Sequence, residues 1–270
     1  MRILFDADML VFRMCRACEE WNPFDKSVLE KADPEETWRT IELRAQQCIE
    51  IATEYFDTDV HPVFCFSSHR NYRKEINPDY KSNRKDPKPV LYNDMKAKCE
   101  RLFDCEEWDG LEADDVMGIL QTEDTIICSG DKDMRQIEGY HLNLIDPELG
   151  IERTTPKEGD ALFRNQCLSG DATDGYYGCP SIGKVKAKQI IDTTTNSDWW
   201  SIVVQTYRDA MSPKSRTETT EGGVKRTIKL RSVNRGLTEA DALLTARMAY
   251  ILRNEDDYDK EKHEVKLWAP

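Results

Sequence analysis

The stretch RILFD, residues 2–6, is a short apolar run that ends on an acid, Asp6. Between residues 34 and 56, apolar residues recur at helical spacing, which predicts a long amphipathic helix. A second apolar run, PVFCF at residues 62–66, follows that helix. Strand, helix and strand in this order predict a parallel β-α-β unit at the start of the chain.

The same alternation continues to about residue 150 and predicts an α/β core on a mostly parallel sheet flanked by helices. Its further expected elements are helices near 92–103 and 112–120, a strand at 125–128, a short helix after Asp131 and a strand near 141–145. Beyond residue 150 helices dominate, and we expect them at 156–168, 184–191, 198–211 and 238–253. The segment 212–236 is rich in Lys, Arg, Thr, Ser and Gly, which is typical of a long mobile loop or a hairpin. The tail 265–268 fits an edge strand or simple packing equally well.

Composition excludes several classes of protein. The chain has 270 residues and a formal net charge of −13, and no apolar run approaches the roughly 18 to 20 residues that a membrane helix needs. The acid at Asp6 interrupts the first apolar run before a signal peptide can form, so we expect a cytoplasmic protein. Nine scattered cysteines fit a reducing compartment better than a disulfide framework. Cys15 and Cys18 have the spacing of zinc ligands, but no second pair follows them.

Acidic residues follow the expected strands and open an expected helix. Ligands of parallel α/β sheets bind at the carboxyl ends of the strands, so acids placed there can meet in space. Each one alone is more simply explained as a helix cap or a turn residue. Together they would repel one another unless cations were present, and hard oxygen ligands suit Mg²⁺ or Mn²⁺. The candidate metal ligands are Asp6, Glu112, Asp114, Asp115, Asp131, Asp133, Asp171 and Asp174.

A basic segment stands out in this acidic chain. Residues 70–88 hold seven basic and three acidic residues, a local net charge of +4, together with Tyr72 and Tyr80. If the chain is helical around Lys81, then Lys81, Arg84 and Lys85 share one side of the helix. Cations interleaved with aromatic rings are typical of single-strand nucleic-acid binding, and a plain solvated face is the alternative.

A glycine-containing turn is the second candidate for phosphate binding. It reads GCPSIGKVKAK at residues 178–188, with Gly178 and Gly183 ahead of an expected helix. Glycines allow close backbone approach, and a helix N-terminus offers amide donors to a phosphate. A helix entry also needs no ligand to explain it, so this signal alone is weak.

The motifs taken together resemble the flap endonuclease superfamily and are most similar to the bacteriophage 5′→3′ exonucleases. The likeness runs from residue 3 to about 191 and is carried, in order, by ILFD (3–6), NPDYKSNR (77–84), EADD (112–115), GDKD (130–133), GDATD (170–174) and the turn at 178–188. The ending MAYILR (248–253) with LW (267–268) also resembles the phage branch.

This resemblance implies a domain plan. It implies a PIN-like nuclease core at residues 1–150 with a helical arch at about 69–90, and a helical subdomain at 151–211 that binds duplex through a helix-3-turn-helix motif. Residues 212–270 would then form the mobile loop, the C-terminal helix and the tail.

The resemblance also implies roles for individual residues. The eight acids above would hold two Mg²⁺ ions, with Mn²⁺ able to substitute, and the helix-hairpin-helix turn would bind K⁺. Lys81 and Arg84 would contact the phosphate in the arch as catalytic residues. The expected DNA-binding residues are Arg70, Arg73, Lys74, Tyr80, Lys85, Gly178, Gly183, Lys184, Lys186 and Lys188.

One position departs from the family pattern. After the second strand, where relatives place a metal-site Asp, this chain reads CFSS at residues 65–68, and Ser68 takes that place. A neutral hydroxyl weakens one metal site or makes it depend on water. Our hypothesis is that Asp8 compensates for it.

The sequence therefore predicts a divalent-metal-dependent 5′→3′ exonuclease that acts on duplex DNA from a 5′ end. The resemblance implies flap cleavage and removal of RNA from RNA/DNA hybrids as well, in a monomer that serves phage DNA replication in the host bacterial cytoplasm beside replication proteins. Two alternatives stay open. FDAD at residues 5–8 resembles the nucleophile motif of haloacid dehalogenase-type phosphatases. Ser68 instead raises the possibility of a structure-specific DNA-binding protein with impaired catalysis.

Overall fold

The computed structural model describes residues 1–25, 28–84, 86–194, 198–219 and 225–270. The chain divides into two compact units, each described here by itself. The first comprises 1–76, 84–160 and 251–267, and the second comprises 77–83, 161–250 and 268–270. The basic segment expected at 70–88 is thus shared between the two units.

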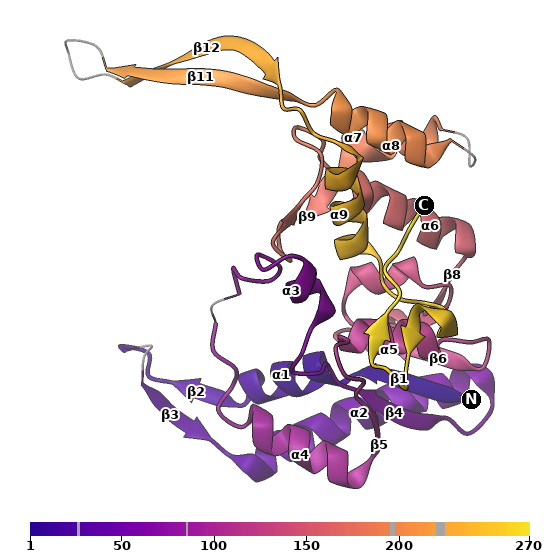
Figure 1. Cartoon of the computed structure of the whole chain (residues 1–270). Helices are drawn as coiled ribbons and strands as arrows, with labels where there is room; N and C mark the ends of the chain where they lie inside the picture. The colour runs from indigo at the N-terminus through magenta and orange to yellow at the C-terminus, as the bar shows by residue number, and fades with distance from the viewer. Residues whose placement is uncertain (26–27, 85, 195–197, 220–224) are drawn as a thin grey trace. The chain divides into compact units, whose positions relative to one another are not determined.

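The first unit is built on a six-stranded sheet in the order β5-β4-β1-β6-β7-β8 (Figure 1). Every neighbouring pair is parallel except the antiparallel edge pair β7–β8, so the expected α/β fold with a mostly parallel sheet is confirmed. The strands are β1 (Arg2–Asp6), β4 (His61–Cys65), β5 (Asp104–Glu106), β6 (Thr125–Cys128), β7 (Gly139–Leu142) and β8 (Ile151–Thr154).

Both faces of the central strands are buried. In β1, Ile3 and Phe5 belong to the same buried cluster as Phe64 of β4, whose ring stacks on Phe5 at a centroid distance of 5.1 Å. Helices pack on this core because their apolar residues recur at helical spacing. They are α1 (Ala7–Ala17), α2 (Pro34–Phe56), α4 (Tyr92–Leu102) and, in contact with β1 and β4, α5 (Ala113–Leu120). Shorter elements complete the unit: β2 (Glu19–Trp21), β3 (Leu29–Ala32), α3 (Tyr72–Ile76), η1 (Lys132–Gln136), η2 (Pro147–Leu149), η3 (Glu255–Asp257), β13 (Tyr258–Asp259) and β14 (Glu264–Val265).

The second unit is mainly helical and carries a long two-stranded hairpin (Figure 1). Its elements are α6 (Pro156–Ser169), which begins in the first unit, β9 (Gly170–Asp171), β10 (Tyr176–Tyr177), α7 (Lys184–Asp192), α8 (Trp199–Arg208), β11 (Met211–Thr219), β12 (Lys225–Asn234) and α9 (Glu239–Ala249). Antiparallel pairing of β11 with β12 decides the open question at 212–236 in favour of a hairpin. The tail pairs too, since Val265 of β14 lies opposite Tyr258 of β13.

The helix around Lys81 that would place its cations on one side does not form. Helix α3 ends at Ile76, and residues 78–83 form hydrogen-bonded turns in which Lys81 has a φ of 54°. Pro78 gives the reason, because a proline disfavours helical geometry in the residue before it. The shared helical side proposed for Lys81 and Arg84 is therefore wrong, and Lys85 lies outside the described residues.

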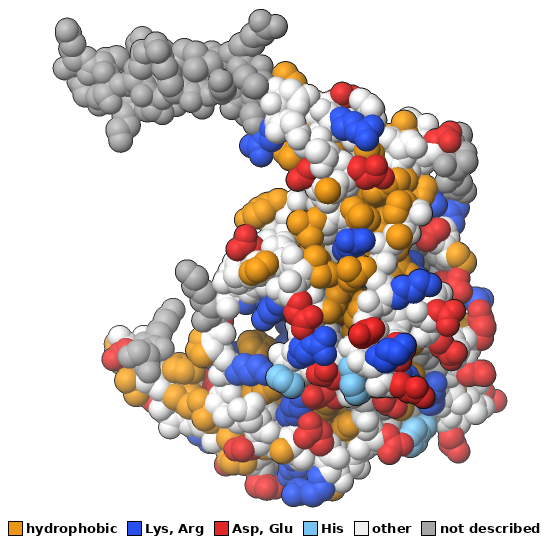
Figure 2. Space-filling view, in the orientation of Figure 1, with side chains coloured by type: hydrophobic (Ala, Val, Ile, Leu, Met, Phe, Trp, Pro, Cys, Tyr) orange, Lys and Arg blue, Asp and Glu red, His pale blue; other side chains and the backbone are white. Residues whose placement is uncertain are grey.

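No helix within the described ranges is long and apolar enough to cross a membrane. On the face drawn in Figure 2, acidic and basic side chains lie interspersed, so the net charge of −13 does not produce a uniformly acidic surface there. Charge acts locally, because screening limits exposed charges to roughly 10 Å.

Candidate functional site

The acids of the first unit follow the carboxyl ends of neighbouring strands. Asp6 is the last residue of β1 and caps helix α1, accepting a hydrogen bond from the amide of Met9 at 3.0 Å. Ser129, directly after β6, donates its hydroxyl to Asp6 at 2.8 Å and accepts from the amide of Asp131 at 3.0 Å. Because β1 and β6 are parallel neighbours, Ser129 connects the end of β1, where Asp6 lies, to the loop after β6 that carries Asp131.

Asp6 is a carboxylate under electrostatic strain. It is 5% exposed, and burial raises its pKa to about 6. The negative charges of Asp8 and Asp131 contribute to this rise in pKa, and the hydrogen bonds from Met9 and Ser129 oppose it. A divalent cation at this place would relieve the repulsion, and carboxylate oxygens are its preferred ligands.

Asp8 and the two serines after β4 have distinct partners. Asp8 accepts a hydrogen bond from the hydroxyl of Tyr92 and another from the amide of Ser67 at 2.7 Å. The Ser67 hydroxyl in turn accepts from the amide of Ala113 at the start of α5, at 3.0 Å. Ser68 faces elsewhere, since its hydroxyl lies 3.4 Å from Asp109. Ser67, and not Ser68, is thus the serine in contact with Asp8.

The acids of α5 contact a buried arginine. Asp115 is fully buried and binds both terminal nitrogens of Arg73, at 2.6 and 2.7 Å. Glu112, directly before the helix, accepts from the same guanidinium at 3.1 Å. Asp114 is half-buried on the first turn, as is Asp133 in η1, whose amide donates to Asp131 at 2.8 Å.

The structure corrects one expected DNA contact here. Arg73 is 2% exposed and is held by these two acids, so it does not face a nucleic acid. Arg70 remains partly exposed and pairs with Glu75 and Asp109, at 2.7 Å each. The hydrogen bond from Arg70 holds the pKa of the Asp109 carboxyl below its usual value. Lys74 is exposed on α3.

The second unit brings the segment 77–83 onto the loop between β9 and β10. The Lys81 amide donates to the Asp174 carbonyl at 2.7 Å, and its ammonium group lies 3.4 Å from the Asp174 carboxylate. The Tyr80 hydroxyl contacts the same carboxylate at 3.3 Å. The side-chain amide of Asn83 donates to the backbone carbonyl of Ala172 at 3.1 Å. Asp171 accepts from the amide of Thr173 at 2.7 Å.

Tyr80 is a second correction. Its residue is only 3% exposed, and its ring lies 6.3 Å from that of Tyr176 between centroids. The side chain therefore fixes the turn to the β9–β10 loop and offers no open ring for a base to stack on. Arg84, at the end of the basic motif, is exposed.

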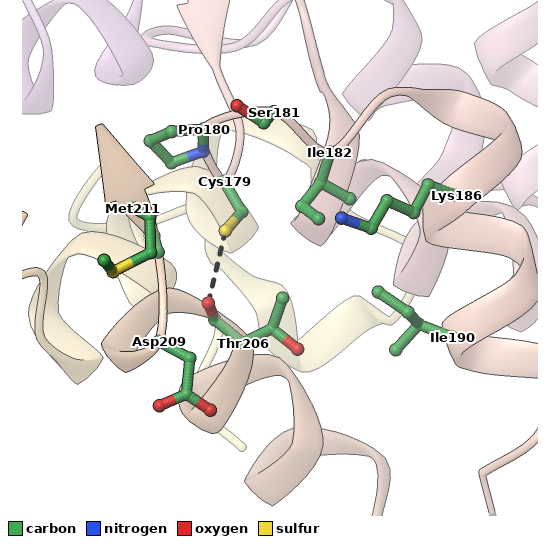
Figure 3. A pocket seen from close by; sticks show the side chains of 10 residues that line it. Cys179, Pro180, Ser181, Ile182, Lys186, Ile190, Thr206, Asp209 and Met211 are labelled. Carbon is green, nitrogen blue, oxygen red and sulfur yellow. Dashed lines mark hydrogen bonds between the residues drawn. The ribbon is translucent and has the colours of Figure 1, made fainter. Parts of the chain in front are cut away.

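The glycine-containing turn precedes α7 and lies beside a cavity of about 480 Å³ (Figure 3). Cys179, Ile182 and Lys186 line it from the turn and α7, and Thr206 and Asp209 from the end of α8. The Cys179 thiol donates to the Thr206 carbonyl at 3.4 Å, which ties the turn to α8. Gly183 caps α7, and no side chain caps the helix at that position.

The cations of α7 are accessible to solvent. Lys184, Lys186 and Lys188 are all exposed. Lys184 lies 3.7 Å from the carboxylate of Asp171, and Lys188 pairs with Asp192 at 2.7 Å. These are weak surface pairs that a phosphate could replace at small cost.

The two glycines of this turn differ in how much space surrounds them. A Cβ on Gly178 would lie 2.2 Å from the Leu168 carbonyl and 2.4 Å from the Gly170 amide, whereas one on Gly183 would meet nothing within 4 Å. We expect Gly178→Ala to lower the free energy of unfolding by about 1–3 kcal/mol, because the neighbours are backbone atoms that cannot move aside. The matched change Gly183→Ala should cost less than about 1 kcal/mol. Urea unfolding of both variants measures the difference, and equal losses would contradict this assignment.

Across the described ranges, no three of the His, Cys, Asp and Glu side chains are grouped so that they could hold a metal ion. The described acids therefore do not form a finished coordination shell. Their chemistry still suits a divalent cation, since a buried carboxylate with two negative neighbours and a raised pKa lacks a cation of its own.

Comparison with known proteins decides the family. Residues 1–164 match the family model described as the 5′-3′ exonuclease N-terminal resolvase-like domain. The chain belongs to the 5′-3′ exonuclease family. It is 30% identical to the exodeoxyribonuclease of Enterobacteria phage T3, over 99% of this chain and 92% of that protein. It is 29% identical to the exonuclease of Escherichia phage T7, over 99% and 93%.

Solved structures agree on the fold of this 5′-3′ exonuclease family member. The T5 D15 protein co-crystallized with metal ions superposes with a TM-score of 0.50 at 16% identity, covering 74% of this chain and 77% of that one. The catalytic core of Rad2 in complex with DNA substrate gives a TM-score of 0.50 at 15% identity, covering 77% and 62%. The PIN-like fold is thereby confirmed. The family match and the phage relatives show that the chain is a nuclease, so the phosphatase alternative loses its support.

Proposed function

We propose that this chain is a divalent-metal-dependent 5′→3′ exonuclease that hydrolyses duplex DNA from its 5′ end, with flap cleavage and removal of RNA from hybrids as related activities. The observation that carries the proposal is the buried, charge-strained Asp6, joined through Ser129 to Asp131 at the ends of two parallel strands. The phage relatives named as exonucleases support the class of the reaction, and the description of the matching family model supports its direction.

In this proposal the ligands of Mg²⁺ are carboxylates. They are Asp6, Glu112, Asp114, Asp131, Asp133, Asp171 and Asp174. When bound, a pair of divalent ions supplies an activated water and stabilises the oxygens of the scissile phosphodiester. Mn²⁺ would substitute for Mg²⁺, because both prefer oxygen ligands.

The chain's own cations would hold the substrate. Lys81 would contact the scissile phosphate from its place beside the Asp174 carboxylate, and Arg84 would add a second contact. Lys184, Lys186 and Lys188, with the N-terminus of α7, would bind the duplex backbone, and a K⁺ ion at that turn would assist them. The protein would work as a monomer next to replication proteins.

The test is digestion of three 5′-labelled substrates: a duplex, a flap and an RNA/DNA hybrid. We expect short labelled products from each with Mg²⁺ and none with EDTA. The Asp131→Ala variant should fold normally, as judged by circular dichroism, and should give no products even with Mg²⁺. Binding in EDTA without nicking in either Mg²⁺ or Mn²⁺ would refute the proposal and favour a DNA-binding protein without catalysis.

A further inference from the structure

A buried cation–carboxylate cluster joins three segments of the first unit. Arg73 comes from α3, Asp115 from the first turn of α5, and the amide of Leu252 from the segment after α9. Arg73 and Asp115 are 2% and 0% exposed, so neither charge is screened by solvent. The pairing is bidentate, with both guanidinium nitrogens on the two oxygens of one carboxylate. This geometry fixes direction as well as charge.

The hydrogen-bonding capacity of Asp115 is used up inside the protein. Its Oδ1 accepts from Arg73 at 2.7 Å and from the Leu252 amide at 3.1 Å. Its Oδ2 accepts from Arg73 at 2.6 Å and from the Glu112 amide at 3.4 Å. A carboxylate offers about four lone-pair sites, so Asp115 has its full number of donors without a metal ion.

Glu112 binds the same guanidinium, but with a longer contact and a more exposed side chain than Asp115. Arg73 Nη1, which binds Asp115 at 2.6 Å, also lies 3.1 Å from Glu112 Oε2. The side chain of Glu112 is 11% exposed against 0% for Asp115, so it is the acid of this pair that reaches solvent. A guanidinium fixed by Asp115 holds Glu112 in one orientation.

We propose that Arg73 is a positioning residue for the metal site: anchored on Asp115, it orients the Glu112 carboxylate for a divalent cation, and Asp115 acts as the anchor and not as a ligand. The inference rests on the proposed function and replaces the expectation that Asp115 binds metal. Partners that orient a metal ligand commonly change metal affinity by about 10- to 100-fold when they are removed.

The experiment measures Mn²⁺ binding by isothermal titration in the absence of DNA. Arg73→Lys keeps the positive charge but loses the fork, and we expect it to bind Mn²⁺ about 10-fold more weakly. The double variant Arg73→Met with Asp115→Leu removes both members of the bidentate pair together, so neither of these two ions is left buried without the other. It should show the same loss or more, because the guanidinium that orients Glu112 is then absent.

A second readout separates positioning from simple damage to the fold. The Mg²⁺ concentration for half-maximal cleavage should rise about 10-fold in Arg73→Lys, while cleavage at saturating Mg²⁺ recovers to within about 3-fold of wild type. A purely structural role predicts instead a lower melting temperature with unchanged Mn²⁺ affinity of the folded protein. The control Arg153→Gln with Glu123→Gln removes an exposed pair at 3.0 Å and should leave Mn²⁺ binding unchanged.

Unchanged Mn²⁺ affinity in Arg73→Lys and in the double variant would overturn the inference. If the double variant does not fold, Arg73→Lys alone decides the question. Failure of the proposed function is distinguishable, because the wild-type protein would then lack Mg²⁺-dependent cleavage. Asp115→Asn adds an internal check: as an anchor it should impair Mn²⁺ binding no more than Arg73→Lys does, whereas loss of a direct ligand would impair it more.

Discussion

Asp6→Asn should abolish cleavage and, at the same time, stabilise the metal-free protein above pH 6. The loss of activity should be about 1,000-fold or more, because an oxygen ligand is replaced by a neutral amide where charge is needed most. Asn still accepts the hydrogen bond from Met9, and the Ser129 hydroxyl can rotate to accept from the new amide, so the cap of α1 survives.

The sign of the stability change follows from the pKa. Burial raises the Asp6 pKa from 3.8 to about 6, so the folded protein holds this proton more tightly than the unfolded chain. Well below pH 4 the Asp6 carboxyl is protonated in both the folded and the unfolded state, so it does not lower the free energy of unfolding. As the pH rises through 6 the folded state must carry the buried charge, and stability falls by up to about 3 kcal/mol. Asn removes that cost.

Urea unfolding in EDTA between pH 4 and pH 8 measures this difference. We expect the Asp6→Asn variant to gain about 1–3 kcal/mol over wild type at pH 7 and nothing at pH 4. Added Mg²⁺ should stabilise wild type at pH 7 and stabilise the variant far less. Asp146→Asn, an exposed acid before η2, is the matched control and should change neither stability nor cleavage. If the Asp6→Asn variant were less stable than wild type at pH 7, burial of the Asp6 charge would not be destabilising, which would contradict this argument.

Much of the core could be predicted from the sequence because its signals are local. Apolar runs gave β1, β4 and β6 to within a residue or two, and helical periodicity gave α2 from 34 to 56. Asp6 and Asp131 could be named as candidate site residues for the same reason, since Asp6 ends such a run and Asp131 lies in the loop after one. Local patterns of this kind need no knowledge of distant contacts.

The remaining features depend on contacts between distant residues. Arg73 was grouped with the basic segment, yet its partner Asp115 lies 42 residues away and buries it. Without knowledge of such a distant partner, a basic residue within a charged segment is predicted to be exposed to solvent. Ser129 and Ser67 were missed because a serine after a strand carries no signal by itself, although both come just after strands that end near acids. The turn at Lys81 differed from the expected helix because Pro78 ended the helix early.

Lys81→Ala should slow cleavage by about 100-fold or more while duplex affinity changes by less than about 3-fold. The Lys81 side chain is 13% exposed, and its ammonium group lies 3.4 Å from the Asp174 carboxylate and 5.0 Å from the centre of the Tyr80 ring. A cation held this closely is aimed with little freedom, as a contact to one phosphate requires. Removing a single such contact from a developing negative charge typically costs 100- to 1,000-fold in rate.

The comparison with Lys188→Ala gives this prediction its test. Lys188 is 69% exposed and pairs only weakly with Asp192, so its loss should weaken duplex binding several-fold and reduce the salt dependence by about one ion. Single-turnover cleavage with saturating enzyme separates the two effects, because it reports the rate of the bound complex. Lys81→Ala should be slow in that measurement and Lys188→Ala near wild type. Equal losses of rate and affinity in Lys81→Ala would show that Lys81 only binds DNA, since a group that acts on the transition state must affect the rate more than the affinity.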